Sequence, residues 1–330
     1  MPPDATEALL AVDDLTVDFA TRRGALTAVR GVSFSIAAGE VLGLVGESGA
    51  GKSVTGAAII GLIDPPGRIA SGRVLLGGRR IDDLPPAAMR KVRGREIGAV
   101  FQDPLTALDP LYSVGRQLVE TIRAHLDVTE AQARERALAL LADVGIPAPA
   151  GRFAHYPHQF SGGMRQRVVI ALALAAGPRL IIADEPTTAL DVSIQAQIIG
   201  LLARLAREHR TAVLLITHDM GVVAEIASRI AVMYAGRIVE IGPVDDVIHR
   251  PRHPYTAGLM GSIPTVRARR DRLVQIEGAM PRLTALPSGC AFHTRCMRAR
   301  PNCASLVPQL ARLGTSDVAC HWPLEGGVAA

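Results

Sequence analysis

The chain has 330 residues, of which 48% are hydrophobic, 20% charged and 3% aromatic, a mixture that excludes a disordered or fibrous protein. The net charge of +5 is too mild to indicate a nucleic-acid partner, and the whole excess lies in residues 265–330, where nine arginines face four acidic residues. The first 289 residues hold no cysteine, which excludes a secreted disulfide framework there. The longest apolar run, 168–176, is far shorter than the ~20 residues that span a bilayer, and no signal peptide is visible. We expect a soluble, cytosolic chain.

Alternating apolar and polar residues predict half-buried strands at 15–19 and 32–36. The continuous apolar run 41–45 predicts a strand buried on both faces, with a helix following from 52 to about 62. Later in the chain, strands are predicted at 97–101, 180–183 and 213–216, and a hairpin is predicted from 230–234 and 237–241. A helical segment is predicted at 113–145, and helices are predicted at 192–208 and 219–227.

Together these elements predict an α/β fold, with an antiparallel β layer, a mainly parallel core sheet and a helical insertion at about 103–175. Prolines and cysteines accumulate after residue 250. We therefore predict a large α/β domain at 1–250 and a small cysteine-rich extension at 251–330.

Residues 46–53 read Gly-Glu-Ser-Gly-Ala-Gly-Lys-Ser, which matches the phosphate-loop pattern in full, and they lie between a predicted strand and a predicted helix. Glycines let successive backbone N–H groups converge on phosphate oxygens, and the following helix start adds positive charge. A chance glycine-rich turn is the alternative, which the flanking elements disfavour. The residues predicted to bind ATP here are Gly46, Glu47, Ser48, Gly49, Ala50, Gly51, Lys52, Ser53 and Val54.

Two acids follow the buried strand 180–183, at the edge of the sheet where open α/β folds bind ligands. We predict that Asp184 and the Ser53 hydroxyl hold Mg²⁺, and that Glu185 deprotonates the attacking water. In isolation, two acids after a strand are also compatible with a helix N-cap.

The ordered motifs resemble those of the ATP-binding subunits of ABC transporters over residues 8 to about 250, which implies a P-loop ABC-type nucleotide-binding domain. The motifs are the phosphate loop, Gln102 after a strand, Ser161-Gly162-Gly163, Asp184-Glu185, Ala189-Leu190-Asp191 and His218. The commonest family signature has Leu and Gln where this chain has Phe160 and Met164.

The resemblance implies a head-to-tail dimer of two such domains around two ATP molecules. In it, the signature residues Ser161, Gly162, Gly163 and Met164 would contact the ATP held by the partner. The other implied roles are adenine stacking by Phe19, Mg²⁺ or water contact by Gln102, a catalytic γ-phosphate contact by His218 and coupling of the two sites by Asp191. As the structural alternatives, Phe19 would be a core residue, and Gln102 and His218 ordinary polar residues at strand ends.

Further segments resemble the dipeptide/oligopeptide/nickel importer group: 101–104, 160–167, 253–256 followed by 263–264, and 286–290. This resemblance implies an ATPase that energises an importer for peptides or a related solute. Its partners would be a second, non-identical ATPase subunit, two permeases whose coupling helices meet the insertion, and an extracytoplasmic solute-binding protein. The chain would then lie on the cytoplasmic face of the plasma membrane. Dipeptide, oligopeptide, nickel, haem and sugar all remain open as the solute.

Other functions fit the sequence less well. ABC ATPases of DNA repair carry a long coiled-coil insertion, but this chain shows no sustained heptads between its phosphate loop and its signature. Ribosome-acting ABC proteins have two tandem ATPase domains. A metal-binding regulatory or nucleic-acid module built on the cysteine tail would leave the ATPase motifs idle.

Cys290, Cys296, Cys303 and Cys320 form a C-x5-C-x6-C-x16-C pattern without the C-x2-C pair that is usual in zinc ribbons. Four thiolates in a small loop-rich segment suit a [4Fe–4S] cluster with a structural role, and the importer-group resemblance points the same way. Zn²⁺, or free or disulfide-bonded cysteines, remain the alternatives. His293 and His321 lie nearby, and we expect neither to be a ligand.

Overall fold

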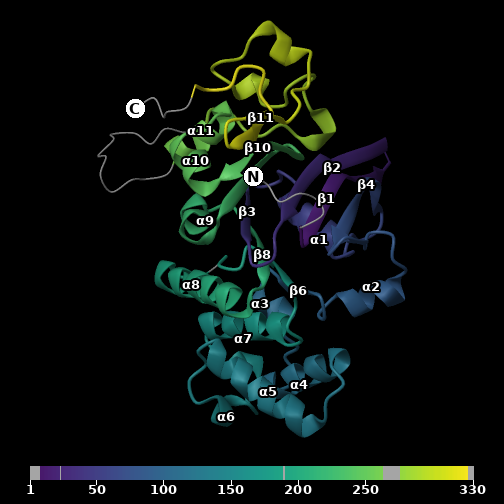
Figure 1. The fold of residues 1–330 in the computed structure, drawn as a ribbon, viewed down its shortest axis with the longest axis vertical. Helices are drawn as coiled ribbons and strands as arrows, with labels where there is room; N and C mark the ends of the chain where they lie inside the picture. Colours follow the sequence, from purple (N-terminus) through teal and green to yellow (C-terminus); the bar gives the residue numbers. More distant parts are fainter. Residues whose placement is uncertain (1–7, 23, 189, 263–275, 326–330) are drawn as a thin grey trace.

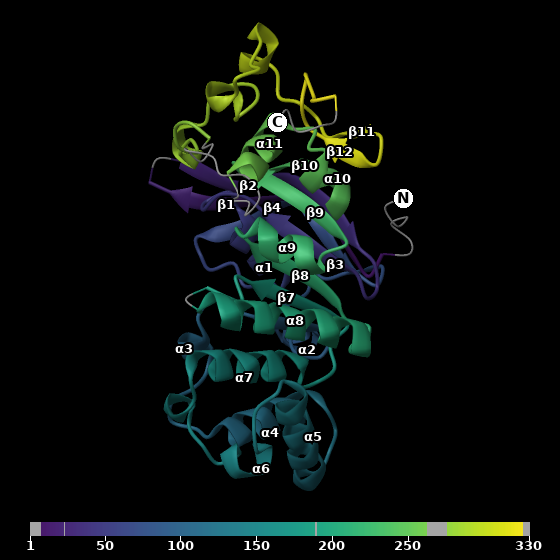
Figure 2. The ribbon, with the colours of Figure 1, turned by 90° about the vertical axis from the view of Figure 1, so that its left-hand side faces the viewer.

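The computed structural model describes residues 8–22, 24–188, 190–262 and 276–325 (Figure 1). The described chain is elongated: the C-terminal segment lies at one end, two β-sheets lie in the middle and the helices α4 to α6 lie at the other end (Figures 1 and 2). Within the described ranges, every helix is too short or too polar to span a bilayer.

The smaller sheet is antiparallel and has the strand order β2-β1-β4-β5. Its strands are β1 (Leu10–Thr21), β2 (Gly24–Ile36), β4 (Gly67–Leu76) and β5 (Arg79–Arg80). The burial of β1 alternates in its middle part, over 15–18, because one side of the pleat faces the second sheet and the other faces outward.

The larger sheet has eight strands in the order β11-β12-β10-β9-β3-β8-β7-β6. The run from β9 to β6 is parallel, and the remaining pairs are antiparallel. Its strands are β3 (Val41–Val45), β6 (Ile97–Val100), β7 (Leu180–Asp184), β8 (Ala212–Thr217), β9 (Arg229–Tyr234), β10 (Arg237–Pro243), β11 (Ala311–Leu313) and β12 (Ser316–Val318). All residues of β3 and β8 are buried, as expected for central strands covered on both faces.

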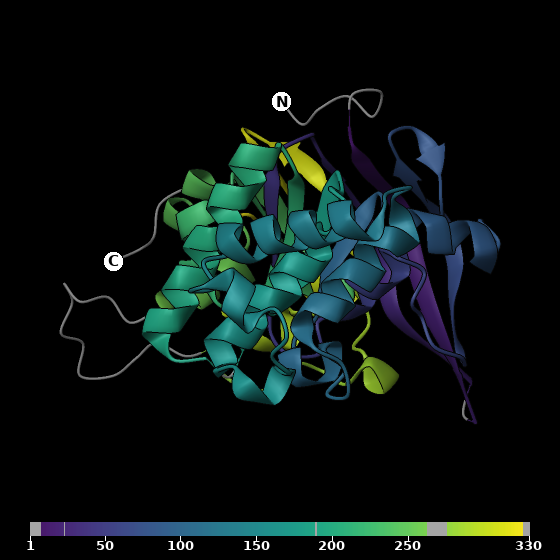
Figure 3. The same cartoon turned by 90° about the horizontal axis from the view of Figure 1, so that it is seen from below.

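Helices cover the larger sheet and build the lower part of the molecule, where they lie in front of the strands when the molecule is seen from below (Figure 3). The α-helices are α1 (Lys52–Ile59), α2 (Pro86–Val92), α3 (Pro104–Ala107), α4 (Val114–His125), α5 (Glu130–Asp143), α6 (Pro149–Arg152), α7 (Gly162–Leu174), α8 (Val192–His209), α9 (Met220–Ile226), α10 (Val244–His249) and α11 (Pro254–Gly261). Single 3₁₀ turns are η1 (Pro157–Gln159), η2 (Leu283–Ala285), η3 (His293–Arg295) and η4 (Pro301–Ala304).

The hydrophobic core has two parts, one on each face of the larger sheet. One part lies between the two sheets and includes Leu10 of β1 and Leu42 of β3. The other part lies under the helices and continues into the C-terminal segment, where Phe292 is only 3% exposed. Strand β12 also pairs with β10, so the C-terminal segment extends the same sheet that carries the nucleotide motifs.

The predicted α/β layers are confirmed: an antiparallel β layer, a mainly parallel core sheet and helices between β6 and β7. The helical stretch 113–145 is two helices, and Thr129 with Gln132 forms the predicted capping box at the start of α5. The helix expected to reach about residue 62 ends at Ile59. Strands β4 and β5 and helix α2 were not predicted from the sequence.

Candidate active site

The phosphate loop follows β3 and leads into α1, and its backbone adopts positive φ angles that favour glycine, with the tightest packing at Gly46 and Gly51. Gly46 has φ +152°, and a Cβ there would stand 2.2 Å from the carbonyl oxygen of Met233. Gly51 has φ +104°, and a Cβ would stand 2.8 Å from the carbonyl oxygen of Ala28. Because side chains at these two positions would clash, bare backbone forms this part of the loop. The loop leads into the start of α1, where backbone N–H groups point outward and suit a phosphate.

Lys52 lies inside this loop and is only 5% exposed. Its ammonium donates hydrogen bonds to the carbonyl oxygens of Gly46 at 2.8 Å and Glu47 at 3.1 Å. Burial lowers the pKa of Lys52, while the charges of Glu185 and Asp184 act in the opposite direction. The Lys52 ammonium is thus bonded to the loop and attracted electrostatically by Asp184 and Glu185.

Ser53 and Asp184 meet across the site, because β3 and β7 both pair with β8 and end at the same edge of the sheet. The Ser53 hydroxyl donates to Asp184 Oδ1 at 3.0 Å. Burial raises the pKa of Asp184, and the hydrogen bond from Ser53 opposes this effect. A hydroxyl and a carboxylate side by side are hard oxygen ligands of the kind that Mg²⁺ prefers, so the donor set fits this ion.

Glu185 follows in a left-handed backbone conformation with φ +46°, a costly geometry for a residue with a side chain. Gln102 Nε2 donates to its Oε2 at 3.1 Å, the Thr188 hydroxyl donates to the same oxygen at 2.8 Å, and His218 Nδ1 lies 3.1 Å from Oε1. Burial alone would raise the pKa of Glu185, but the hydrogen bonds from Thr188 and His218 outweigh it and hold the pKa below its usual value. An ionised, firmly oriented carboxylate is what a general base requires.

Thr188 was missed by the sequence reasoning. It lies in the turn after Glu185, where its N–H also donates to the Glu185 carbonyl at 3.2 Å. Proline favours the second position of a four-residue turn, so Pro186 between Glu185 and Thr188 was the available signal.

The signature residues lie at the start of α7, where the Ser161 hydroxyl accepts a hydrogen bond from Met164 N at 3.4 Å. Gly162 and Gly163 form the first turn of that helix. Figures 1 and 2 show α7 among the lower helices and α1 higher up, beside the two sheets. The structure therefore groups these residues apart from the chain's own phosphate loop.

The remaining predicted residues lie on other elements. Phe19 is half-buried on β1, and its ring packs close to Gly67. Asp191 is the N-cap residue of α8, with no side-chain cap hydrogen bond. Ala189 and the segment 263–264, named in the sequence motifs, lie outside the described residues.

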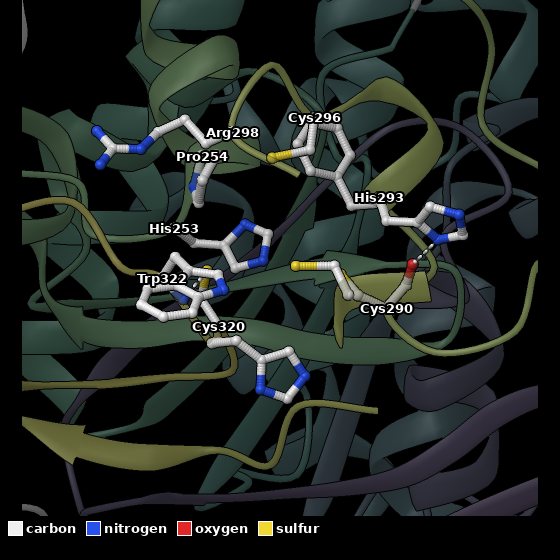
Figure 4. Close-up of a pocket in the computed structure, with 11 residues that line it drawn as sticks. His253, Pro254, Cys290, His293, Cys296, Arg298, Cys320 and Trp322 are labelled. Carbon is white, nitrogen blue, oxygen red and sulfur yellow. Dashed lines mark hydrogen bonds between the residues drawn. The ribbon is translucent and has the colours of Figure 1, made fainter. Parts of the chain in front are cut away.

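The four cysteines line one cavity in the C-terminal segment, together with His253, His293 and His321. In Figure 4 the sulfurs of Cys290 and Cys296 point toward this cavity, and a hydrogen bond joins His293 Nδ1 to the Cys290 carbonyl at 2.8 Å. All four cysteines are free thiols, and burial raises the pKa of Cys320 to about 11.

The cavity does not show a formed metal site. Among the residues that the structure describes, no three or more His, Cys, Asp or Glu side chains are grouped so that they could hold a metal ion. The donor chemistry would suit iron or zinc, because thiolates are soft ligands that these metals prefer, and a metal ion would deprotonate the thiols on binding.

A phosphate loop that faces two acids at the edge of a parallel sheet defines the site of a P-loop ATPase. The family model described as ABC transporter matches residues 29–188, and the model described as Oligopeptide/dipeptide transporter, C-terminal region, matches residues 239–303. The chain is 48% identical over 319 residues to the Oligopeptide transport ATP-binding protein OppD of Bacillus subtilis, covering 96% of this chain and 89% of that one. It is 46% identical over 319 residues to the Dipeptide transport ATP-binding protein DppD of Escherichia coli, covering 96% of this chain and 98% of the relative.

Among solved structures, the ATP-binding cassette MJ0796 in a dimeric post-hydrolysis state bound to ADP and Pi matches with a TM-score of 0.64 and 29% identity, over 71% of this chain and 98% of the other. This chain belongs to the ATP-binding proteins of ABC transporters, in the branch that carries the oligopeptide/dipeptide transporter C-terminal region. It is an ATPase subunit that couples ATP hydrolysis to transport.

Proposed function

We propose that this chain hydrolyses ATP with Glu185 as the general base and supplies the energy for peptide import. The observation that carries the proposal is the anchoring of the Glu185 carboxylate by Gln102, Thr188 and His218. The phosphate-loop amides and Lys52 would bind the β- and γ-phosphates opposite this carboxylate.

The oxygen atoms of Ser53 and Asp184, with the amide oxygen of Gln102, would hold the Mg²⁺ that neutralises phosphate charge. Glu185 would take the proton from the attacking water, and His218 would keep the carboxylate oriented while also contacting the γ-phosphate. Because Gln102 already donates to Glu185, its amide links the base to the magnesium ligands.

We further propose that a complete site needs two ATPase subunits. The start of α7, with Ser161, Gly162 and Gly163, would contact the ATP of the partner, since free amides at a helix start suit a phosphate. Asp191 would couple the two sites, and Phe19 would stack on adenine. The placement of α7 away from α1, and the dimeric state named for the related cassette MJ0796, support this arrangement.

As partners we propose a homologous second ATPase subunit, two permeases and an extracytoplasmic solute-binding protein, with the chain held at the cytoplasmic face of the membrane. The helices between β6 and β7 would receive the permeases. In support, Leu105 and Leu111, in the first part of this insertion, are 61% and 79% exposed, and they follow the site residue Gln102 closely in the chain. Peptides are proposed as the solute because the matched relatives are named for oligopeptide and dipeptide transport.

For the C-terminal part, we propose that residues 251–330 form a distinct extension in which the four cysteines hold a [4Fe–4S] cluster, with Zn²⁺ as the alternative. The shared cavity, the absence of disulfides among these cysteines and the thiolate preference of iron–sulfur clusters support it. Four thiolates around such a centre carry negative charge, which Arg298, another residue lining the cavity, would offset.

The import function can be tested by expressing the chain with its candidate permeases and second ATPase subunit, and comparing the uptake of a labelled dipeptide with that of nickel. We expect dipeptide uptake that requires the wild-type chain. Nickel uptake with no dipeptide uptake would contradict the peptide assignment while leaving the ATPase role intact.

A further inference from the structure

A side chain of the C-terminal segment reaches into the phosphate loop. Arg295, at the end of η3, donates from Nη1 to Glu47 Oε1 at 3.0 Å and to Glu47 Oε2 at 3.1 Å. The Arg295 side chain is 6% exposed and that of Glu47 is 27% exposed, so water screens this ion pair far less than a surface pair. Glu47 is the second residue of the loop, and Arg295 directly precedes Cys296.

The rest of the guanidinium is also anchored. Its Nη1 donates to Tyr234 Oη at 3.3 Å, its Nε to the Glu277 carbonyl at 2.9 Å and its Nη2 to the Gly278 carbonyl at 3.2 Å. These partners fix the planar guanidinium in one orientation, so that it restrains the Glu47 carboxylate. The ion pair of Arg295 with Glu47 therefore restrains the phosphate loop.

Two further contacts support the same loop. The N–H of Glu47 donates to Tyr255 Oη at 3.0 Å. Met280 lies against Gly49, where a Cβ would stand 3.1 Å from its methyl group. Tyr255 is fully buried, and its ring packs on Phe292 with centroids 5.3 Å apart, which couples the loop to the turn between Cys290 and Cys296.

We propose that Arg295 is a positioning residue of the ATP site, and that through it the C-terminal segment sets the nucleotide affinity of the phosphate loop. Glu47 places a negative charge in a loop that must bind an anion, and like charges at this range repel. Arg295 neutralises the Glu47 carboxylate and keeps it away from the phosphate-binding position. Without Arg295, Glu47 would oppose the phosphates and the loop would lose one of its supports.

The proposal depends on ATP binding, which the family membership establishes, and is independent of what fills the cysteine cavity. Coupling between two sites is reciprocal in binding free energy. Nucleotide in the loop must therefore stabilise the contacts of Arg295 as much as Arg295 stabilises the nucleotide.

The test measures the dissociation constants of MgADP and of a non-hydrolysable MgATP analogue on the full-length chain. We expect Arg295→Ala to weaken both by about tenfold, within the usual range of coupling between sites. Arg295→Ala combined with Glu47→Gln should recover most of the affinity, because no unpaired carboxylate remains. Arg312→Ala removes an exposed ion pair with Asp317 elsewhere in the C-terminal segment and should leave affinity unchanged.

A merely structural role for Arg295 predicts a different pattern: the double variant would bind no better than Arg295→Ala. Unchanged affinity in Arg295→Ala would also overturn the proposal. If the alanine variant is poorly folded, Arg295→Gln keeps the bulk without the charge and must show the same loss. In the wild type, MgADP should slow hydrogen exchange within residues 290–303, and the absence of that slowing would refute the coupling.

Discussion

The nucleotide site draws its side chains from distant parts of the sequence, whereas the cysteine-lined cavity draws most of its own from residues 290–322, and the two differ in what holds those side chains. In the nucleotide site, parallel strands of one sheet end at a common edge, and Glu185 receives its hydrogen bonds from residues on other strand ends and turns. The fold itself therefore arranges this site before any ligand binds.

The cysteine cavity is built on loops and short 3₁₀ turns. The contacts of its sulfurs are weak, such as Arg300 N to Cys303 Sγ at 3.5 Å and Trp322 N to Cys320 Sγ at 3.4 Å. The two regions teach that a site at a sheet edge can be prearranged by the fold, whereas side chains on loops are held weakly and would take their final geometry from any ligand that binds them.

The first prediction tests the prearranged side of this comparison and carries the largest expected effect. Glu185→Gln keeps the size and much of the hydrogen bonding of the side chain but removes the base. We expect ATP turnover to fall by about 10²–10⁴-fold, the usual contribution of general base catalysis, while ATP remains bound. Steady-state phosphate release and nucleotide retention measure the two effects.

Glu208→Gln is the matched control, because Glu208 pairs with Arg204 on the exposed face of α8. It should turn over ATP like the wild type. Phosphate release by Glu185→Gln at the wild-type rate would show that Glu185 is not the general base.

The second prediction tests the ligand-dependent side. Cys303 is the most buried of the four cysteines, at 8% exposed. Cys303→Ser replaces a soft thiolate with a hydroxyl that binds iron poorly. In anaerobically purified protein we expect iron content and visible absorption to be largely lost, as measured by metal analysis and spectroscopy.

His293→Ala and His321→Ala provide controls in the same cavity and should retain the iron. Wild-type protein that contains zinc without iron would favour the zinc alternative. Wild-type protein without either metal would contradict both metal proposals. The cavity would then be an empty space between loops.

The sequence predicted best those elements whose burial is nearly complete. The apolar runs of β3, β7 and β8 are strands because they lie at the centre of the sheet, and the polar residues that follow them form the site. Strand β4 was missed because Arg68 and Arg73 interrupt its apolar pattern. Strands β11 and β12 have three residues each, and their pairing with β10 is a tertiary contact that no local pattern indicates.

The same limit applies within the site. The buried strand before it identified Glu185, and the family resemblance identified Gln102 and His218, which the structure places within hydrogen-bonding distance of Glu185. The spacing of motifs did not reveal Arg295, because its partner Glu47 is 248 positions away. A contact between residues so distant in the chain depends on tertiary packing, which local sequence patterns do not indicate.

The third prediction concerns the smallest effect, the support of Glu185 by Thr188. Thr188→Val keeps the shape of the side chain and removes the hydroxyl that donates to Glu185 Oε2 at 2.8 Å. One fixed orientation of the carboxylate is then lost, and we expect kcat to fall by about tenfold, equivalent to ~1.4 kcal/mol of barrier. The KM for ATP should change little, because Thr188 supports the base and makes no part of the phosphate loop.

Thr188→Ser retains the hydroxyl and should recover most of the activity, which separates the hydrogen bond from packing. Thr121→Val is the matched control, since its hydroxyl donates to the Gln117 carbonyl within α4. Wild-type kcat in Thr188→Val would mean that Gln102 and His218 alone fix the carboxylate. The prearrangement of the nucleotide site would then rest on the strand ends, with no need of the turn that follows β7.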